Sequence, residues 1–188
     1  MTDPSATPPP PGTAAPRAPA VDGLLRPGLL EGRAILVAGA GELGEAAASA
    51  CSGLGASVAR DELPDPLHTL VFDAADAFAT GGLRAALDGA WEAVRPAGVE
   101  RMIPAGDGQV VLLAPRPGAG KHVEATRDGL ENLARTLSIE WARHQVRIVA
   151  LHPGAGTPAA EVGALTAFLA SPAGAYYSGC RFSLGEAG

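Results

Sequence analysis

The chain has 188 residues, of which 47% are hydrophobic and 18% are charged, and its formal net charge is −6. This composition is typical of one globular domain with a substantial core, and the negative charge argues against binding to nucleic acid or to an anionic membrane. Two cysteines and four histidines lie far apart, without the spacing of metal ligands, so we expect no metal site. No apolar run is long enough to span a membrane, and we expect a cytoplasmic protein.

Residues 1–24 are rich in proline, alanine and threonine and carry no apolar pattern. Such a segment cannot bury enough apolar surface to offset the entropy of ordering it. We therefore predict a disordered tail over residues 1–24 and a single domain over residues 25–188.

Within this domain, short apolar runs alternate with helical patterns. Strands are predicted at 34–38, 57–60, 67–74, 108–115, 146–154 and 179–185. An alanine-rich helix is expected between the first two strands, and further helices over 82–103, 123–144 and 158–172. Strands that alternate with helices predict an α/β fold, here a Rossmann-like doubly wound parallel sheet of reduced size.

The first predicted strand ends in a glycine-rich turn. Gly39, Gly41 and Gly44 form Gly-x-Gly-x-x-Gly between a strand and a helix, which is the pattern that binds the pyrophosphate of NAD(P). Asp61 follows the second strand, where an acidic residue would bind the ribose. Glu42, however, places a carboxylate at the helix start, where it would repel a phosphate. Two interpretations stay open: weak binding of NAD(P), or a packed turn without a cofactor.

Three blocks carry a resemblance to a known family: "LLEGRAILVAGAGELGEAAA", "LARTLSIEWARHQVRIVALHPG" and "VGALTAFLASPAGAYYSGCRFSLGEAG". In their order and spacing they resemble the short-chain dehydrogenases/reductases and are similar to bacterial β-ketoacyl carrier-protein reductases. The resemblance implies an NAD(P)-dependent oxidoreductase fold. It also implies truncation, because the chain is shorter than the family after the second strand and after Thr157.

The resemblance further implies that the catalytic residues are missing. The family's tyrosine and lysine match Val123 and Arg127, and its serine matches Ala114 or Pro115. No serine lies between positions 57 and 138, and the only tyrosines are at 176 and 177, so no small shift of the alignment restores the set.

The Pro-Gly turn of the family, which holds the nicotinamide carboxamide, matches Pro153 and Gly154. This turn completes the set of positions at which the resemblance would place a cofactor.

Three functions follow as alternatives. The first is a catalytically silent subunit that pairs with an active NAD(P)-dependent partner in a hetero-oligomer. It rests on a helix that reads as apolar on more than one side, with Leu130, Leu133, Ala134, Leu137, Ile139 and Trp141. The second is an oxidoreductase with reassigned catalysis by Asp73, Asp76 or His152, although carboxylates that follow a strand more often cap the next helix. The third is a dinucleotide-binding sensor.

Overall fold

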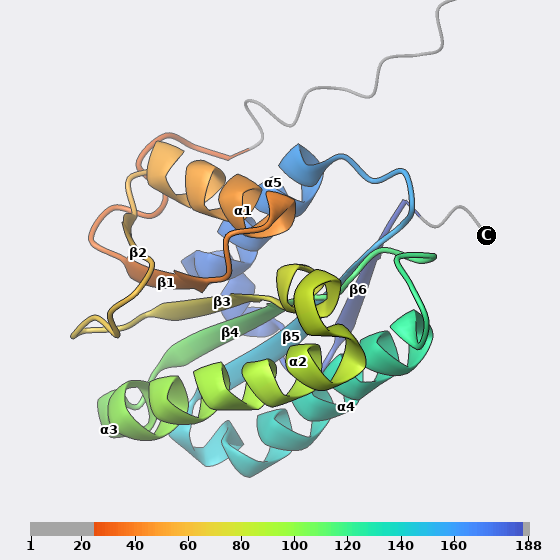
Figure 1. The fold of residues 1–188 in the computed structure, drawn as a ribbon. Coiled ribbons are helices and arrows are strands. Elements are labelled where there is room, and N and C mark those ends of the chain that lie inside the picture. The colour runs from red at the N-terminus through yellow and green to blue at the C-terminus, as the bar shows by residue number, and fades with distance from the viewer. Residues whose placement is uncertain (1–24, 186–188) are drawn as a thin grey trace, which may run out of the picture.

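The computed structural model describes residues 25–185, and the predicted tail over residues 1–24 lies outside this part of the chain. Six parallel strands form one sheet in the order β2-β1-β3-β4-β5-β6 (Figure 1). The strands are β1 (Ala34–Ala38), β2 (Ser57–Ala59), β3 (Thr69–Asp73), β4 (Gly108–Leu113), β5 (Val146–Pro153) and β6 (Arg181–Leu184). The predicted α/β class and the Rossmann-like parallel sheet are therefore confirmed.

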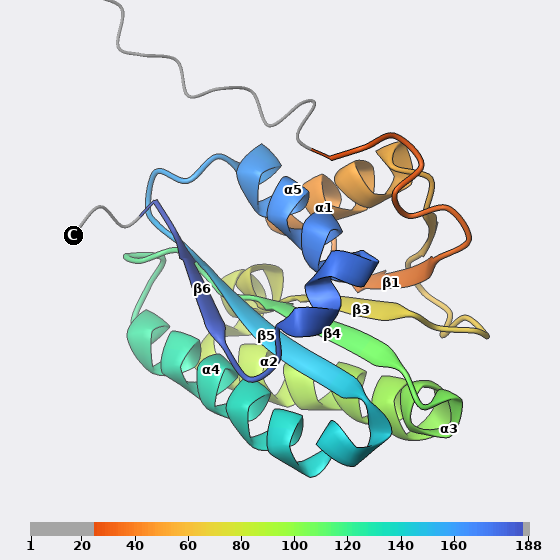
Figure 2. The same ribbon diagram turned by 180° about the vertical axis from the view of Figure 1, so that it is seen from behind.

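Helices connect the strands and cover both faces of the sheet. The α-helices are α1 (Glu42–Gly53), α2 (Ala74–Pro96), α3 (Ile103–Ala105), α4 (Val123–Glu140) and α5 (Ala159–Ala170). A π-helix spans Ala97–Met102, and 3₁₀ helices span Ala142–His144 and Pro172–Tyr176. In Figures 1 and 2, α1 and α5 lie on one face of the sheet, and α2 and α4 lie on the other. Among the described helices, none combines the length and the apolar character that crossing a membrane requires.

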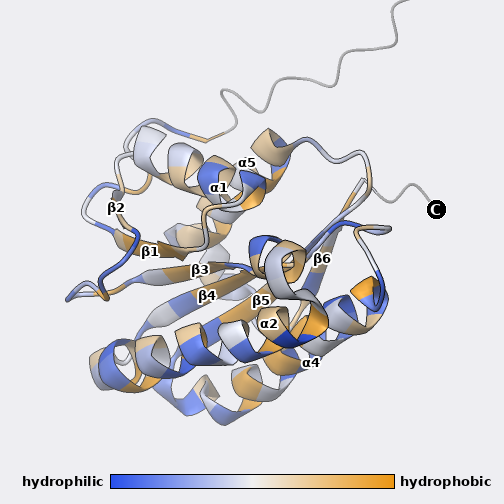
Figure 3. Ribbon diagram, viewed as in Figure 1, coloured by the Kyte–Doolittle hydropathy of each residue, from blue (hydrophilic) through white to orange (hydrophobic). Residues whose placement is uncertain are grey.

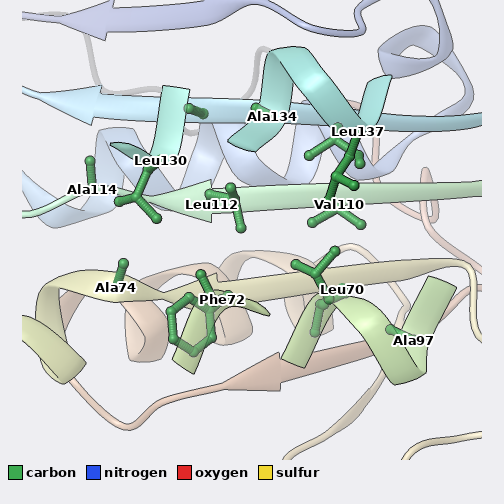
Figure 4. Packing of buried hydrophobic residues seen from close by; sticks show 14 of the residues in the cluster. Leu70, Phe72, Ala74, Ala97, Val110, Leu112, Ala114, Leu130, Ala134 and Leu137 are labelled. Carbon is green, nitrogen blue, oxygen red and sulfur yellow. The ribbon is translucent and has the colours of Figure 1, made fainter. Parts of the chain in front are cut away.

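Two apolar cores result, one on each face, because alternate residues of a strand point to opposite sides. On the α2/α4 face, Leu70, Phe72 and Leu112 pack with Leu130 and its neighbours on α4 (Figure 4). On the other face, Val71 and Val111 pack beneath α1 and α5. Hydrophobic residues follow the central strands, whereas α2 and α4 alternate hydrophobic and hydrophilic positions (Figure 3). Strands buried on both faces are typical of a parallel sheet covered by two helical layers.

The second helix begins earlier than the sequence pattern predicted. It starts at Ala74, directly after β3, because the carboxylate of Asp73 accepts hydrogen bonds from the backbone N–H groups of Ala75 and Asp76 and caps the helix. Gly81 and Gly82 then depart from helical geometry and kink it. The helical pattern that began at residue 82 therefore marked only the part beyond the kink.

The predicted second apolar side of α4 is not found. Leu130, Ala134 and Leu137 are buried against the sheet, Leu133 packs at the border of the same core, and Trp141 closes its end. Ile139 is the exception among the six, with 74% of its surface exposed. One core-facing stripe accounts for α4, because α2 packs beside it and covers residues that the sequence pattern assigned to a second interface.

The order of the strands brings two turns together. Strand β1 lies between β2 and β3, so the connection from β1 to β2 runs toward one edge of the sheet, whereas β3 and the later strands lie on the other side of β1. Ala38 at the end of β1 is paired in register with Phe72 near the end of β3. In open α/β sheets the crevice at such a switch in strand order is the usual ligand site.

Candidate functional site at the carboxyl edge of the sheet

The glycine turn (Gly39–Gly44) lies at the carboxyl ends of β1 and β3, where Asp73 meets it. The backbone N–H of Gly44 donates to Oδ2 of Asp73 at 2.8 Å, and this carboxylate is almost fully buried. Its other oxygen accepts the two capping bonds of α2. One carboxylate therefore joins the N-terminus of α1 to the N-terminus of α2.

The three glycines of the turn fit closely around this carboxylate. A Cβ atom at Gly39 would lie 2.8 Å from Cβ of Asp73, and one at Gly41 would lie 2.7 Å from its Oδ2. At Gly44, a Cβ atom would lie 2.9 Å from the carbonyl oxygen of Gly39 and 3.0 Å from the same Oδ2. Any side chain at these positions would force the carboxylate or the turn to move. Packing against Asp73 is thus a sufficient reason for all three glycines.

A second carboxylate covers the turn from the side of α2. The backbone N–H of Ala40 donates to Oδ2 of Asp76 at 3.1 Å, and a Cβ atom at Gly41 would lie 2.9 Å from Cβ of Asp76. Two amide groups of the turn are thus bonded to carboxylates of the chain itself. In a pyrophosphate site, amides of such a turn point at the phosphate oxygens.

Burial and hydrogen bonding act in opposite directions on the pKa of Asp73. Burial raises it above the ordinary value, and the charge of Asp76 adds to this rise. The hydrogen bonds from Gly44, Asp76 and Ala75 lower it and reduce the net shift. Burial therefore makes the ionised form of Asp73 less favourable, and the three backbone hydrogen bonds offset this only in part.

Two arginines that the sequence analysis did not select pair with the carboxylates of Glu45 and Glu42 at the carboxyl edge of the sheet. Arg60, at the end of β2, donates to the carbonyl oxygen of Gly39 at 3.0 Å and pairs with Glu45 at 2.8 Å. Arg116, after β4, pairs with Glu42 at 2.9 Å and donates to the carbonyl oxygen of Thr157 at 2.8 Å. Arg116 thereby spans the carboxyl edge from the glycine turn to the loop after β5.

Asp61, the predicted ribose ligand, lies next to Arg60 but is exposed. Arg60 is the residue at the end of β2 that reaches the glycine turn. Two signals in the sequence could have selected Arg60: its position at the end of the second strand and its charge opposite to that of Glu45 in the first helix.

The position matched to a catalytic lysine holds a structural arginine. Arg127 is 3% exposed, and its Nη1 donates to the carbonyl oxygens of Pro115 at 2.7 Å and Pro153 at 3.0 Å. Its Nε pairs with Glu124 at 3.4 Å. Arg127 therefore ties the segment after β4 to the end of β5. Val123, at the matched tyrosine position, is buried in the α2/α4 core.

His152 on β5 lies on the same face as Arg127 and is 2% exposed. Burial, which is the largest cause, and the positive charges of Arg127 and Arg181 together lower its pKa to about 4. Its Nε2 has no hydrogen-bond partner within the described residues. A neutral imidazole enclosed in this way cannot reach a substrate without a movement of α4 or the sheet.

The predicted nicotinamide turn is bonded to the last strand. The backbone N–H of Gly154 donates to the carbonyl oxygen of Leu184 at 2.7 Å and to the hydroxyl of Thr157 at 2.9 Å. That hydroxyl in turn donates to the carbonyl of Leu184 at 2.9 Å. Pro153 and Gly154 thus anchor β6 to β5, and the amide that would face a carboxamide is already bonded.

Other chemical groups are inert or scattered. Burial raises the pKa of the Cys51 thiol to about 12 and raises that of Cys180 as well, so neither is activated as a thiolate. In residues 25–185, no three His, Cys, Asp or Glu side chains are arranged to hold a metal ion.

Comparisons with known proteins place the fold. A citronellol catabolism dehydrogenase, AtuB of Pseudomonas aeruginosa PAO1, has a similar structure with a TM-score of 0.71 and 24% sequence identity, over 86% of this chain and 96% of that one. BdcA (YjgI) of E. coli is similar with a TM-score of 0.66 and 20% identity, over 83% of this chain and 100% of that one. At these identities the likeness shows the fold alone. No family model and no curated protein matches the chain.

These findings correct one prediction. The assignment to the short-chain dehydrogenases/reductases, close to the β-ketoacyl carrier-protein reductases, was wrong: no model of that family matches, and the similar structures are distant in sequence. The blocks that suggested it are a strand, a glycine turn and a helix, and a helix, a strand and a Pro-Gly turn. A parallel α/β sheet imposes such patterns for packing reasons, as the bonding of Gly44 and Gly154 illustrates.

Proposed function

We propose that the chain is a catalytically silent Rossmann-like subunit that associates with an active NAD(P)-dependent oxidoreductase, stabilising it or completing its active site. The observation that supports this best is the occupation of the glycine turn by the chain's own carboxylates. Asp73 bonds the amide of Gly44, and Asp76 bonds the amide of Ala40.

A dinucleotide would have to compete with these carboxylates. Two unit charges of the same sign 4 Å apart repel by about 4 kcal/mol at an effective dielectric constant near 20. A pyrophosphate over the turn would meet Asp76 and Glu42, and Arg116 is already paired with Glu42. Displacing Asp73 would also remove the cap of α2. The turn is therefore stable as it stands and poorly suited to phosphate.

Of the three candidates for proton transfer at this edge, only Asp76 is partly exposed, and its carboxylate accepts a hydrogen bond from the amide of Ala40. Reduction of a carbonyl requires an acid that reaches the developing alkoxide. Val123 carries no proton donor, and the guanidinium of Arg127 is buried and donates to the carbonyl oxygens of Pro115 and Pro153. Asp73 and His152 are both almost fully buried, so reassigned catalysis by either one would require an opening of the core.

The association half of the proposal draws on exposed apolar side chains in the α2/α4 layer. Trp91 on α2 is 45% exposed, Val99 on the π-helix 54%, and Ile139 on α4 74%. Gly98 lies against the indole of Trp141, so the π-helix and the end of α4 are in contact. Large apolar side chains of this kind are favoured at the centre of protein interfaces.

The cofactor half is tested by titrating the purified protein with NADH and NADPH and following nicotinamide fluorescence. We expect no saturation at micromolar concentrations. The variant Asp76→Ala should bind measurably better than wild type because it frees the amide of Ala40, and Asp88→Ala on the exposed side of α2 serves as the matched control. Micromolar binding by wild type would overturn the silent-subunit proposal.

The partner half is tested by native mass spectrometry after gentle purification from the host. We expect a stoichiometric complex with a dinucleotide-dependent oxidoreductase. Ile139→Glu should release it, and Thr136→Glu, at another exposed position on α4, should not. A homo-oligomer without a second protein would refute this half.

One observation favours a second candidate, a protein that binds NADP(H) without turnover. Arg60 stands at the end of β2, where an arginine can bind the 2′-phosphate of NADP. A preference for NADPH over NADH that disappears in Arg60→Gln would support this candidate.

A further inference from the structure

A pocket of about 270 Å³ lies at the opposite edge of the sheet, where the strands begin. Arg33 precedes β1, Gln109 and Asp107 stand at the start of β4, and Arg147 stands at the start of β5. Leu169 and Ser171 at the end of α5 form the wall on the α1/α5 side, and Pro172 and Ala175 continue it. This pocket is separate from the glycine turn and shares no residue with it.

The amide of Gln109 is held in one orientation. Its side-chain oxygen accepts a hydrogen bond from Nε of Arg147 at 3.3 Å. The reverse orientation would place the NH₂ group against another donor, so the oxygen must face Arg147. The Nε2 group of Gln109 is left without a hydrogen-bond partner among the described residues, in a side chain that is 2% exposed.

The guanidinium of Arg33 also has a buried donor without a hydrogen-bond partner among the described residues. Its Nε is buried and, within residues 25–185, has no hydrogen-bond partner. Burial lowers the pKa of Arg33; the charge of Asp107 raises it, and the charge of Arg147 lowers it. Asp107 is itself engaged by Arg147 in an ion pair. Two guanidinium groups thus share one carboxylate, and the pocket carries one positive charge in excess.

A buried donor without an acceptor costs free energy, and a buried excess charge costs more. Both unpartnered atoms are themselves covered by the protein, so the net positive charge of the pocket that their side chains line decides the ligand, and it favours an anion with several acceptor oxygens. The pocket is several times larger than the roughly 30 Å³ that one water occupies, so a tetrahedral oxyanion fits together with bound water.

We propose that this pocket, bordered by Arg33, Gln109 and Arg147, binds a phosphate group, either as free inorganic phosphate or as the terminal group of a small phosphate monoester. Guanidinium groups match the geometry of phosphate oxygens, and the excess positive charge at the pocket favours an anion over a neutral ligand. The proposal is independent of the proposed function, because it concerns the other edge of the sheet.

The experiment is isothermal titration calorimetry of the full chain with inorganic phosphate, at constant ionic strength kept with sodium chloride. Glycerol phosphate forms the second arm, since tighter binding of the ester than of the free ion would identify a monoester as the ligand. Arg33→Gln removes one guanidinium, and Arg84→Gln removes an equal charge from an exposed position on α2 as the matched control.

We expect saturable phosphate binding that Arg33→Gln weakens at least tenfold and Arg84→Gln leaves unchanged. Gln109→Glu is the second variant: its carboxylate would accept from Arg33 and Arg147, so it should abolish phosphate binding while raising the melting temperature of the ligand-free protein. If Arg33→Gln does not fold, the phosphate affinity of Gln109→Glu tests the pocket instead.

The absence of saturable binding of either ligand to wild type would overturn the proposal. Equal affinities in Arg33→Gln and Arg84→Gln would do the same, and so would full phosphate binding by a folded Gln109→Glu protein.

Discussion

Replacing Asp73 by alanine tests the junction at the carboxyl edge most directly. The substitution removes the cap of α2, which costs about 1 kcal/mol. It also leaves the buried amide of Gly44 without its acceptor at 2.8 Å, which costs about 1–3 kcal/mol. Because burial raises the pKa of Asp73, the variant also relieves the cost of enclosing a carboxylate. We therefore expect a net loss near the lower end of the sum, about 2 kcal/mol.

The assay is urea unfolding at neutral pH, followed by far-UV circular dichroism. A loss of about 2 kcal/mol corresponds to a fall of about 4–8 °C in melting temperature for a chain of this size. Asp88→Ala, which removes an exposed carboxylate from the same helix, should change stability by less than about 0.5 kcal/mol. If the two variants were equally stable, the role assigned to Asp73 would be refuted.

Three further substitutions test other parts of the structure. Gly98→Ala should cost about 1–3 kcal/mol, because its Cβ would lie 2.4 Å from the indole of Trp141, whereas Gly53→Ala, with no atom within 4 Å, should be neutral or stabilising in the same unfolding assay. Equal effects of the two would contradict that packing. Arg127→Met should cost about 3 kcal/mol by leaving two buried carbonyl oxygens without their donor, and a loss below about 0.5 kcal/mol would show that the arginine does not join the strands. His152 has a pKa of about 4 in the folded protein against an ordinary value of 6.5, so the unfolded chain binds the proton first as the pH falls. The free energy of unfolding should therefore be unaffected by this group above pH 6.5 and should fall by roughly 2–3 kcal/mol as the pH drops toward 4. His152→Leu should flatten that part of the profile of stability against pH. An unchanged profile in the variant would show that another group titrates.

The fold was predictable because its signals are local. Each of the four central strands β1, β3, β4 and β5 contains a short apolar run, such as Leu70–Phe72. The start of α2 was missed because it depends on a capping side chain, and the kink at Gly81 and Gly82 divides the pattern that follows.

The candidate site was only partly predictable, because its chemistry depends on contacts across the sheet. The spacing of the glycines identifies the turn, but it does not reveal whether phosphate or a neighbouring carboxylate occupies it. Asp73 is 29 positions from Gly44 in the sequence, and Arg116 is 74 positions from Glu42. The apolar residues of α4 likewise suggested a second exposed apolar face, but Leu133 packs at the border of the α2/α4 core.

Because α1 packs on α5, the apolar face of α1 cannot be buried until α5 has been synthesised. Gly163 lies so close to the backbone of Ala46 that a Cβ atom there would be 2.5 Å from its carbonyl oxygen, so the two helices fit without intervening side chains. Yet about 110 residues separate them, and a ribosome that adds 5–20 residues per second needs roughly 6–20 s to cover that distance. Throughout this interval Leu43, Ala47 and Cys51 have no helix to cover them. The nascent chain therefore presents an apolar helix face to solvent and to chaperones until α5 has been synthesised, and truncation before α5 would leave that face exposed permanently.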